Sequence, residues 1–166
     1  MTNHQSENQS SSKPKAKTFV SKPLKFNLKK LGRKFVRADL EFHGVDHSGP
    51  SYEGRVFINN TKANENTAKT LGNGFVGSYH IFGHGGCFGD VGHCDIHKER
   101  LPYDYRPSHP LTPAYKRITI TDQIKKIGMK TDEFVITIVP ILAGGSEITN
   151  NDIVKLERIS IVTYDK

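Results

Sequence analysis

Residues 36–42, with the sequence VRADLEF, decide the fold class of this chain. Apolar and charged side chains alternate along them, which places four apolar side chains on one face of an extended chain: Val36, Ala38, Leu40 and Phe42. An alternation with period two is typical of a strand that buries one face. We therefore predict a half-buried β-strand over these seven residues.

Other segments have the same character on both sides of this strand. Runs rich in β-branched and aromatic residues, bounded by turn residues, predict strands. They cover residues 52–59, 74–82, 116–121 and 133–139, a last strand that contains Leu156, Ile159 and Ile161, and an additional edge strand at 24–31. Gly77 lies inside one of these runs, where a glycine indicates a β-bulge.

One short helix is predicted at about residues 122–127. Thr121 is a residue type that caps a helix N-terminus, and Gly128 is a residue type that ends one. Between the third and fourth long strands, residues 83–115 contain repeated glycine and proline and form a long Gly-rich loop, a kind of segment that is often functional. The sequence thus predicts an all-β fold, an antiparallel β-sandwich or barrel of about six to eight strands with one short helix.

The chain divides into a tail and one domain. Residues 1–23 are rich in Ser, Lys, Gln and Asn, and we predict that they form a disordered basic tail ahead of a single β-domain at 24–166. Residues 1–38 hold ten basic residues and one acidic residue, whereas the other 128 hold 14 basic and 16 acidic residues. The net charge of +7 therefore belongs to the N-terminal part, and a nucleic-acid partner is not expected.

No apolar stretch approaches the roughly 18 residues of a membrane-spanning helix, so no membrane partner is expected either. The N-terminus has no apolar core of a secretory signal. We expect the chain to be cytoplasmic, or exported only in complex with a partner.

Residues 80–97, HIFGHGGCFGDVGHCDIH, gather both cysteines of the chain and four of its eight histidines. Two pairs have the short spacing that presents two ligands to one ion, His84 with Cys87 and Cys94 with His97. Mixed thiolate and imidazole donors favour copper, as Cu(I), with zinc as the alternative. The candidate metal ligands are Cys87, Cys94, His84, His93, His97 and His80.

Other interpretations of this segment stay open. Its glycines suit positive φ angles, and its histidines would then only hydrogen bond to the backbone. Cys87 and Cys94 could also close a small disulfide loop. A cysteine nucleophile lacks a recognisable orienting partner, and neither GxGxxG nor GxxxxGK[ST] occurs here.

Several stretches resemble the C-terminal domain of tyrosinases and polyphenol oxidases, especially the bacterial enzymes. They are ADLEFHGVDHSGPSYEGRVFINN (38–60), GFVGSYHIFGHGGCFGDVGHCD (74–95), RPSHPLTP (106–113), ITITDQI (118–124), EFVITIVP (133–140) and ERISIVTYD (157–165). The resemblance covers about residues 35–165. It implies a β-domain that sits over a helical dicopper core, keeps the enzyme latent by inserting one side chain into the substrate entrance, and in some members takes part in copper loading.

The helical copper-binding core of that family has no counterpart in this sequence. The resemblance therefore implies a non-catalytic accessory module that covers the active site of a tyrosinase-like dicopper partner, and no phenol oxidation by this chain on its own. The candidates for the shielding side chain are Phe88, Tyr103 and Tyr105, each of which could instead pack within its own loop. The alternatives are a stand-alone metal-binding or thiol redox β-domain that uses Cys87 and Cys94, and a small oxidoreductase with its own mononuclear copper.

Overall fold

The computed structural model describes residues 15–27, 35–84, 112–127, 131–142 and 151–165. Its strands are β1 (Phe19–Val20), β2 (Leu24–Lys25), β3 (Arg37–Val45), β4 (Tyr52–Ile58), β5 (Phe75–Ile81), β6 (Ala114–Thr119), β7 (Glu133–Phe134), β8 (Ile136–Leu142) and β9 (Arg158–Tyr164). A 3-10 turn, η1 (Leu71–Asn73), precedes β5, and helix α2 (Thr121–Ile127) follows β6. The predicted all-β class is confirmed.

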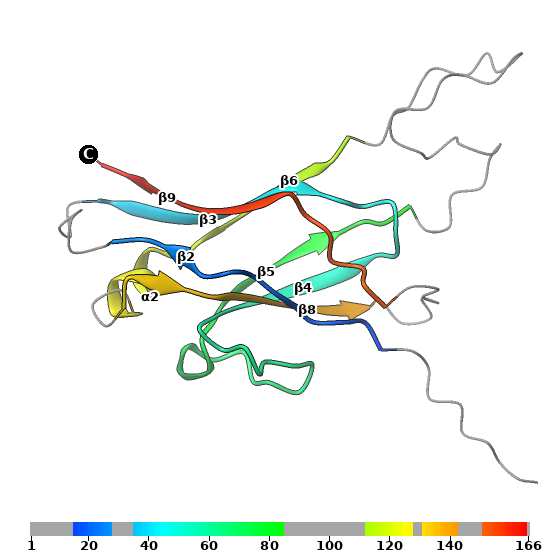
Figure 1. Cartoon of the computed structure of the whole chain (residues 1–166), viewed down its shortest axis with the longest axis horizontal. Helices are drawn as coiled ribbons and strands as arrows, with labels where there is room; N and C mark the ends of the chain where they lie inside the picture. Colours follow the sequence, from blue (N-terminus) through cyan, green and yellow to red (C-terminus); the bar gives the residue numbers. More distant parts are fainter. Residues whose placement is uncertain (1–14, 28–34, 85–111, 128–130, 143–150, 166) are drawn as a thin grey trace, which may run out of the picture.

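The strands form two main sheets that face each other. One has the order β1-β8-β4-β5 and the other the order β6-β3-β9, and β2 and β7 make a small third sheet; all recorded pairings are antiparallel. In Figure 1 the three-stranded sheet runs along the upper side and β5, β4 and β8 lie below it. The sheets do not close into a barrel, so the sandwich alternative of the prediction is the one observed.

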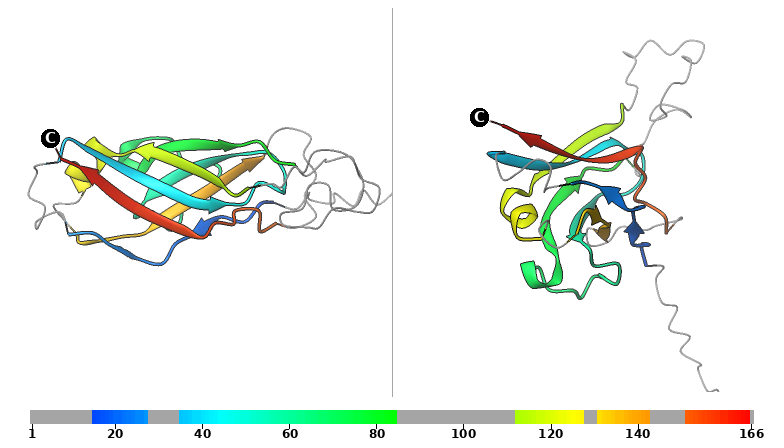
Figure 2. Two further views of the ribbon diagram at one scale, coloured as in Figure 1. Left: turned by 90° about the horizontal axis from the view of Figure 1, so that it is seen from above. Right: turned by 60° about the vertical axis from the view of Figure 1, so that its left-hand side comes forward.

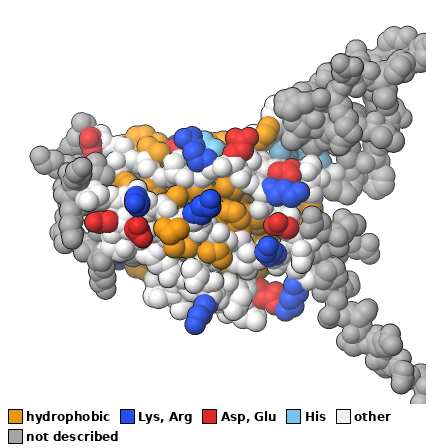
Figure 3. All heavy atoms as spheres, viewed as in Figure 1, with side chains coloured by type: hydrophobic (Ala, Val, Ile, Leu, Met, Phe, Trp, Pro, Cys, Tyr) orange, Lys and Arg blue, Asp and Glu red, His pale blue; other side chains and the backbone are white. Residues whose placement is uncertain are grey.

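The core lies between the two main sheets. Alternate residues of β3 point into it, and the inward side chains of Leu40 and Phe42 are fully buried together with Val56 and Ile138 of the facing sheet. Apolar side chains of the N-terminal segment, such as Leu24 and Phe26, pack against its margin. Figure 3 shows hydrophobic side chains reaching the surface in the middle of this side view, with Lys and Arg among them.

Gly77 marks the bulge that its position predicted. The pairing of β4 with β5 shifts register between Val56 and Phe57, and Gly77 stands at this shift with φ +147°. A Cβ on Gly77 would lie 2.8 Å from Ile118 Cγ2 of the facing sheet. Glycine is therefore required here both by the backbone angle and by the close approach of the two sheets.

Several strand boundaries differ from the prediction. The segment 133–139 forms two strands rather than one, and the second continues through Pro140 to Leu142. Ser21 N donates to Ile136 O, so the backbone N–H and C=O groups of the even-numbered residues of β8 point toward β1. The pairing with β1 extends only as far as Phe19, which lies opposite Ile138. Proline is tolerated at 140 because, among the described residues, no strand pairs with it on that side.

The edge strand predicted at 24–31 is shorter, since β2 covers only Leu24–Lys25; residues 28–31 lie outside the described residues. Thr121, predicted as the cap of the helix, is its first residue, and its Oγ1 accepts a hydrogen bond from Ala38 N. This bond ties the helix to β3, and Ile124 of the helix is fully buried.

The folded part begins earlier than residue 24, which corrects the predicted boundary. β1 pairs with β8 through Phe19 and Val20, and Lys17 N donates to Asn151 O. A polar segment with two apolar residues buries too little apolar surface to fold alone. Here it is held by backbone pairing with β8 at the edge of the four-stranded sheet. Residues 1–14 of the predicted tail lie outside the described residues.

Candidate functional site

One end of the sandwich presents the described residues of the predicted metal and shielding segment. β5 ends at Ile81, and Phe82, Gly83 and His84 follow it. Gly83 N donates to Ser51 Oγ at 3.0 Å, and His84 N donates to His47 O at 3.0 Å. The turn between β3 and β4 thus holds the backbone on which these side chains stand.

Gly83 is needed for this contact between the two turns. A Cβ at Gly83 would collide with backbone atoms of Gly49 and Pro50. At least this glycine of the segment therefore serves close packing of backbone on backbone, a reason different from the positive φ angles of the open interpretation.

Phe82 is the most exposed large hydrophobic side chain among the described residues, with 82% of its surface accessible. Its neighbours Ile81 and Gly83 are fixed, the first by burial in the core and the second by its bond to Ser51. An aromatic ring held outward on a fixed backbone is a typical anchor for a partner surface. In the sequence, Phe82 is only the last residue of the strand predicted at 74–82 and is not among the candidate site residues.

His47 connects the segment that follows β5 with the segment that precedes β6 at this end of the sandwich. Its Nε2 donates to Thr112 O at 2.8 Å, its carbonyl accepts from His84 N, and its ring lies 5.0 Å from the ring of His84 between centroids. His47 is not among the predicted ligands, because it is 37 positions away from His84 in the sequence and follows a different strand.

The predicted metal ligands are only partly within the described residues. His80 lies exposed on β5 opposite Glu53, and His84 is exposed beside His47. Within the described part of the chain, no group of three or more His, Cys, Asp and Glu side chains is placed to hold a metal ion. The remaining candidates lie outside the described residues: Cys87, His93, Cys94 and His97, together with Phe88, Tyr103 and Tyr105.

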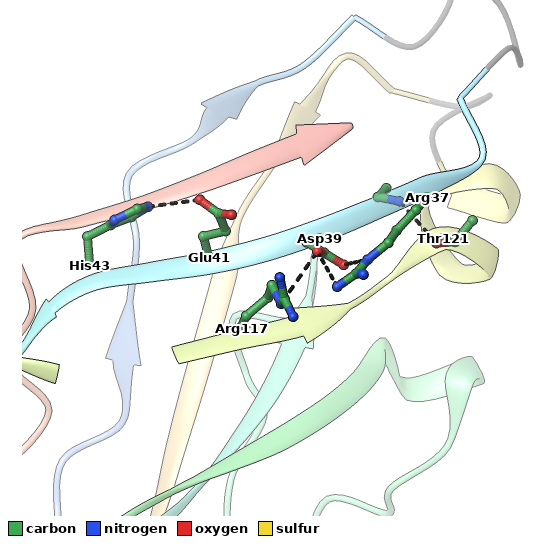
Figure 4. Close-up of polar contacts among 7 residues, drawn as sticks. Arg37, Asp39, Glu41, His43, Arg117 and Thr121 are labelled. Atoms are coloured by element: carbon green, nitrogen blue, oxygen red, sulfur yellow. Dashed lines mark hydrogen bonds and ion pairs between the residues drawn. The ribbon is translucent and has the colours of Figure 1, made fainter. Parts of the chain in front are cut away.

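A second polar cluster lies on the outer face of the three-stranded sheet (Figure 4). Asp39, predicted on the solvent side of its strand, is fully buried on that face. Its Oδ1 accepts from Arg37 Nε at 2.9 Å, and its Oδ2 forms ion pairs with Arg37 Nη2 at 2.7 Å and Arg117 Nε at 3.6 Å. Burial opposes ionisation, but hydrogen bonds from Arg37 and Thr119 outweigh it and lower the pKa of Asp39.

Two strand positions further along β3, Glu41 and His43 form the rest of this cluster. His43 Nε2 lies 3.1 Å from Glu41 Oε2 and 3.1 Å from Ser160 Oγ. Tyr115 hydrogen bonds to Glu41, which raises the tyrosine pKa, and its ring lies 5.2 Å from that of His43. The polar face of β3 therefore carries two groups of linked side chains, one around Asp39 and one around Glu41 and His43, rather than a set of separate solvated charges.

Val36, predicted on the buried face, lies just ahead of β3 and is 46% exposed. The alternation therefore holds within the strand and fails at its first predicted residue, which lies in a bend while the preceding Phe35 is buried in the core. Among the described residues, no helix is long and apolar enough to cross a membrane.

Comparison of the sequence with protein-family models and with characterised proteins finds no match. The structure does match solved ones. Recombinantly expressed latent aurone synthase, a polyphenol oxidase, aligns with 99% of this chain at a TM-score of 0.51 and 13% identity. The same enzyme from its natural source aligns with 99% of this chain at 0.52 and 14%, and the form co-crystallised with hexatungstotellurate(VI) with 95% at 0.52 and 12%.

The chain has the fold of one part of a latent polyphenol oxidase. It spans between 26% and 28% of the length of these three proteins. That share is consistent with the C-terminal shielding domain that the sequence resemblance named, so the predicted resemblance is confirmed at the level of the fold. Identities of 12–14% carry the likeness no further than the polyphenol oxidase fold.

Proposed function

We propose that this chain is a non-catalytic accessory module that covers the active site of a dicopper phenol oxidase catalytic domain. The observation that carries the proposal is the one-sided coverage of the structural match. Nearly all of this chain corresponds to little more than a quarter of an enzyme that is described as latent. A fold that corresponds to one part of an enzyme suits a covering role more than a separate reaction.

Phe82 is the side chain proposed to enter the substrate entrance. A phenol-binding cleft accepts a flat aromatic ring, and a phenylalanine has the same shape and apolar surface as the ring of the substrate. Its 82% exposure means that the ring is available to a partner, and the bonds of Gly83 and His84 to the β3–β4 turn hold its backbone in place. Filling the entrance with this ring would exclude both substrate and water.

Inhibition kinetics test this function. The catalytic domain of a dicopper phenol oxidase from the same organism, freed of any covering domain, is assayed for catechol oxidation with increasing amounts of this chain. We expect inhibition that is competitive with catechol, and a rise of about tenfold in the inhibition constant for Phe82→Ala, corresponding to about 1.4 kcal/mol. Leu71→Ala, which truncates another exposed apolar side chain, is the matched control and should inhibit like the wild type.

No inhibition by the wild-type chain would contradict the covering role itself. Equal inhibition by the wild type and Phe82→Ala would keep the covering role and remove Phe82 from it. The two outcomes separate the function from the residue.

Copper handling by the segment around His84 is a second proposed function. His47 adds an imidazole 5.0 Å from that of His84, so a donor type that suits copper occurs twice at this end. We propose that Cys87 and Cys94 bind one Cu(I) with the help of His84 or His93. A Cu(I) competition titration should show loss of binding in the double variant Cys87→Ser, Cys94→Ser, and equal affinity in both proteins would contradict it.

A further inference from the structure

The outer faces of the two main sheets differ in how far the described residues of the chain cover them. Residues 59–74 fold over the four-stranded sheet, so that Phe57 and Val139 are buried together with Ala63 in a second small core. The outer face of β6-β3-β9 has no such cover among the described residues, and it faces the viewer in the left panel of Figure 2. Its tyrosines remain open, with Tyr115 50% and Tyr164 39% exposed.

The charge that this face shows to solvent is positive, because its two acids are less exposed than its three arginines. The Asp39 side chain is fully buried and that of Glu41 is 13% exposed, whereas the Arg37 and Arg117 side chains are 40% and 46% exposed. Arg158, opposite His43 on β9, is also exposed. The carboxylate of Asp39 therefore lies beneath the guanidinium groups of Arg37 and Arg117 and orients them.

The outward side chains of this face are already held in place. Arg37 is bonded to Asp39 and lies over the ring of Tyr164, with 5.4 Å from its Cζ to the ring centroid. Tyr115 is held by Glu41 and by ring contact with His43. Arginine and tyrosine dominate the energetics of protein interfaces, and side chains that are ordered beforehand lose little entropy on binding.

We propose that the outer face of β6-β3-β9 is a docking surface for an acidic protein surface, whose carboxylates pair with Arg37, Arg117 and Arg158. A single-stranded nucleic acid would use the rings as stacking platforms. Arg37 covers one face of Tyr164 and His43 packs on Tyr115, so these rings offer less stacking surface than such platforms do. This inference is independent of the proposed function, because Phe82 lies beyond the end of β5 in the other sheet.

An NMR titration of the full chain tests the proposal. The probe is a twelve-residue glutamate-rich peptide, with the same peptide carrying glutamine in place of glutamate as a control and oligouridylate as the nucleic-acid comparison. We expect the acidic peptide alone to shift backbone amide signals around Arg37, Tyr115, Arg117 and Tyr164. Shifts confined to the basic residues before Phe35, or tighter binding of the oligouridylate, would overturn the proposal.

Variants locate the binding energy on this face. Arg117→Gln is preferred to a change at Arg37, because Arg117 makes the longer contact with Asp39 and its loss disturbs the buried carboxylate less. We expect Arg117→Gln and, separately, Arg158→Gln to weaken binding of the acidic peptide about fivefold each. Lys62→Gln, an equal loss of charge at an exposed position on the other side, should leave it unchanged. If Arg117→Gln and Arg158→Gln bound the acidic peptide with the same affinity as Lys62→Gln, the proposal would be overturned.

Discussion

The two sheet faces that point away from the core show how one sandwich separates stability from recognition. Residues 59–74 cover the outer face of the four-stranded sheet and bury Phe57 there. An ion pair joins Lys69 of this loop to Glu53 of β4, and another joins its Glu65 to Lys15 ahead of β1. The three-stranded sheet keeps an ordered polar network that the described residues leave open. The outer face of the four-stranded sheet thus buries apolar side chains, whereas the outer face of the three-stranded sheet exposes arginine and tyrosine side chains.

The largest effect is expected at the covered face. Phe57→Ala removes a fully buried ring from between the sheet and its loop, and such truncations cost about 3–5 kcal/mol of the free energy of unfolding. Urea unfolding monitored by circular dichroism measures it. A loss below about 1 kcal/mol would show that the loop does not complete a second core.

Truncation of the N-terminal segment tests how far the four-stranded sheet depends on its edge strand. Removal of residues 1–23 deletes β1 and the partly buried Phe19 and should cost roughly 2 kcal/mol, whereas removal of residues 1–14 should cost almost nothing. Thermal unfolding of the two truncated chains makes the comparison. Equal melting temperatures would mean that the pairing of β1 with β8 contributes nothing to stability.

The Glu53 cluster gives the covered face a dependence on pH. Burial opposes ionisation of Glu53, but hydrogen bonds from Lys69, Arg55 and Ser78 outweigh it and lower its pKa from 4.5 to about 2. A carboxyl with a lowered folded-state pKa stabilises fully above its ordinary value, and this stabilisation is lost as the pH falls from about 4.5 toward 2.

Glu53→Gln should therefore cost about 1 kcal/mol at pH 7, because its cationic partners are partly exposed, and nothing near pH 2. Unfolding curves of the wild type and the variant from pH 2 to 7 measure the difference. A gap of the same size at both ends of this range would show that the charge of Glu53 is not its cause.

The smallest effect is expected at the open face. Tyr115→Phe removes a hydroxyl from a half-exposed ring that touches Glu41 and His43, and it should change the free energy of unfolding by less than about 0.5 kcal/mol. A loss above 1.5 kcal/mol would indicate that the network on β3 supports the fold itself, and the contrast between the two faces would weaken.

The sequence predicts those parts of the fold that follow from local pattern. The alternation from Ala38 onward, the glycine at the bulge and the short helix each carry a signal within a few residues, and each is found. β1 carries almost no such signal, because Phe19 and Val20 become a strand only when β8 offers its edge. The burial of Asp39 likewise depends on Arg117, which is 78 positions away and reaches it only through the sheet.

The candidate site is less accessible to sequence reasoning for the same reason. The composition of residues 80–97 draws attention to donor residues, and His84 is found just after the end of β5, beside His47. Neither His47 nor Phe82 is distinguished by its neighbours in sequence. The first is brought to His84 by the β3–β4 turn, and the second is notable only for an exposure that needs the fold to be known.

Photo-crosslinking from position 82 tests the central claim most directly. The full chain with p-benzoylphenylalanine in place of Phe82 is mixed with the catalytic domain of the dicopper phenol oxidase, irradiated, and mapped by mass spectrometry; the same replacement at Leu71 is the control. The account predicts crosslinks from position 82 to residues that line the substrate entrance above the coppers, and none from position 71. Crosslinks from position 82 to a surface away from that entrance, or none at all under conditions that saturate inhibition, would contradict it.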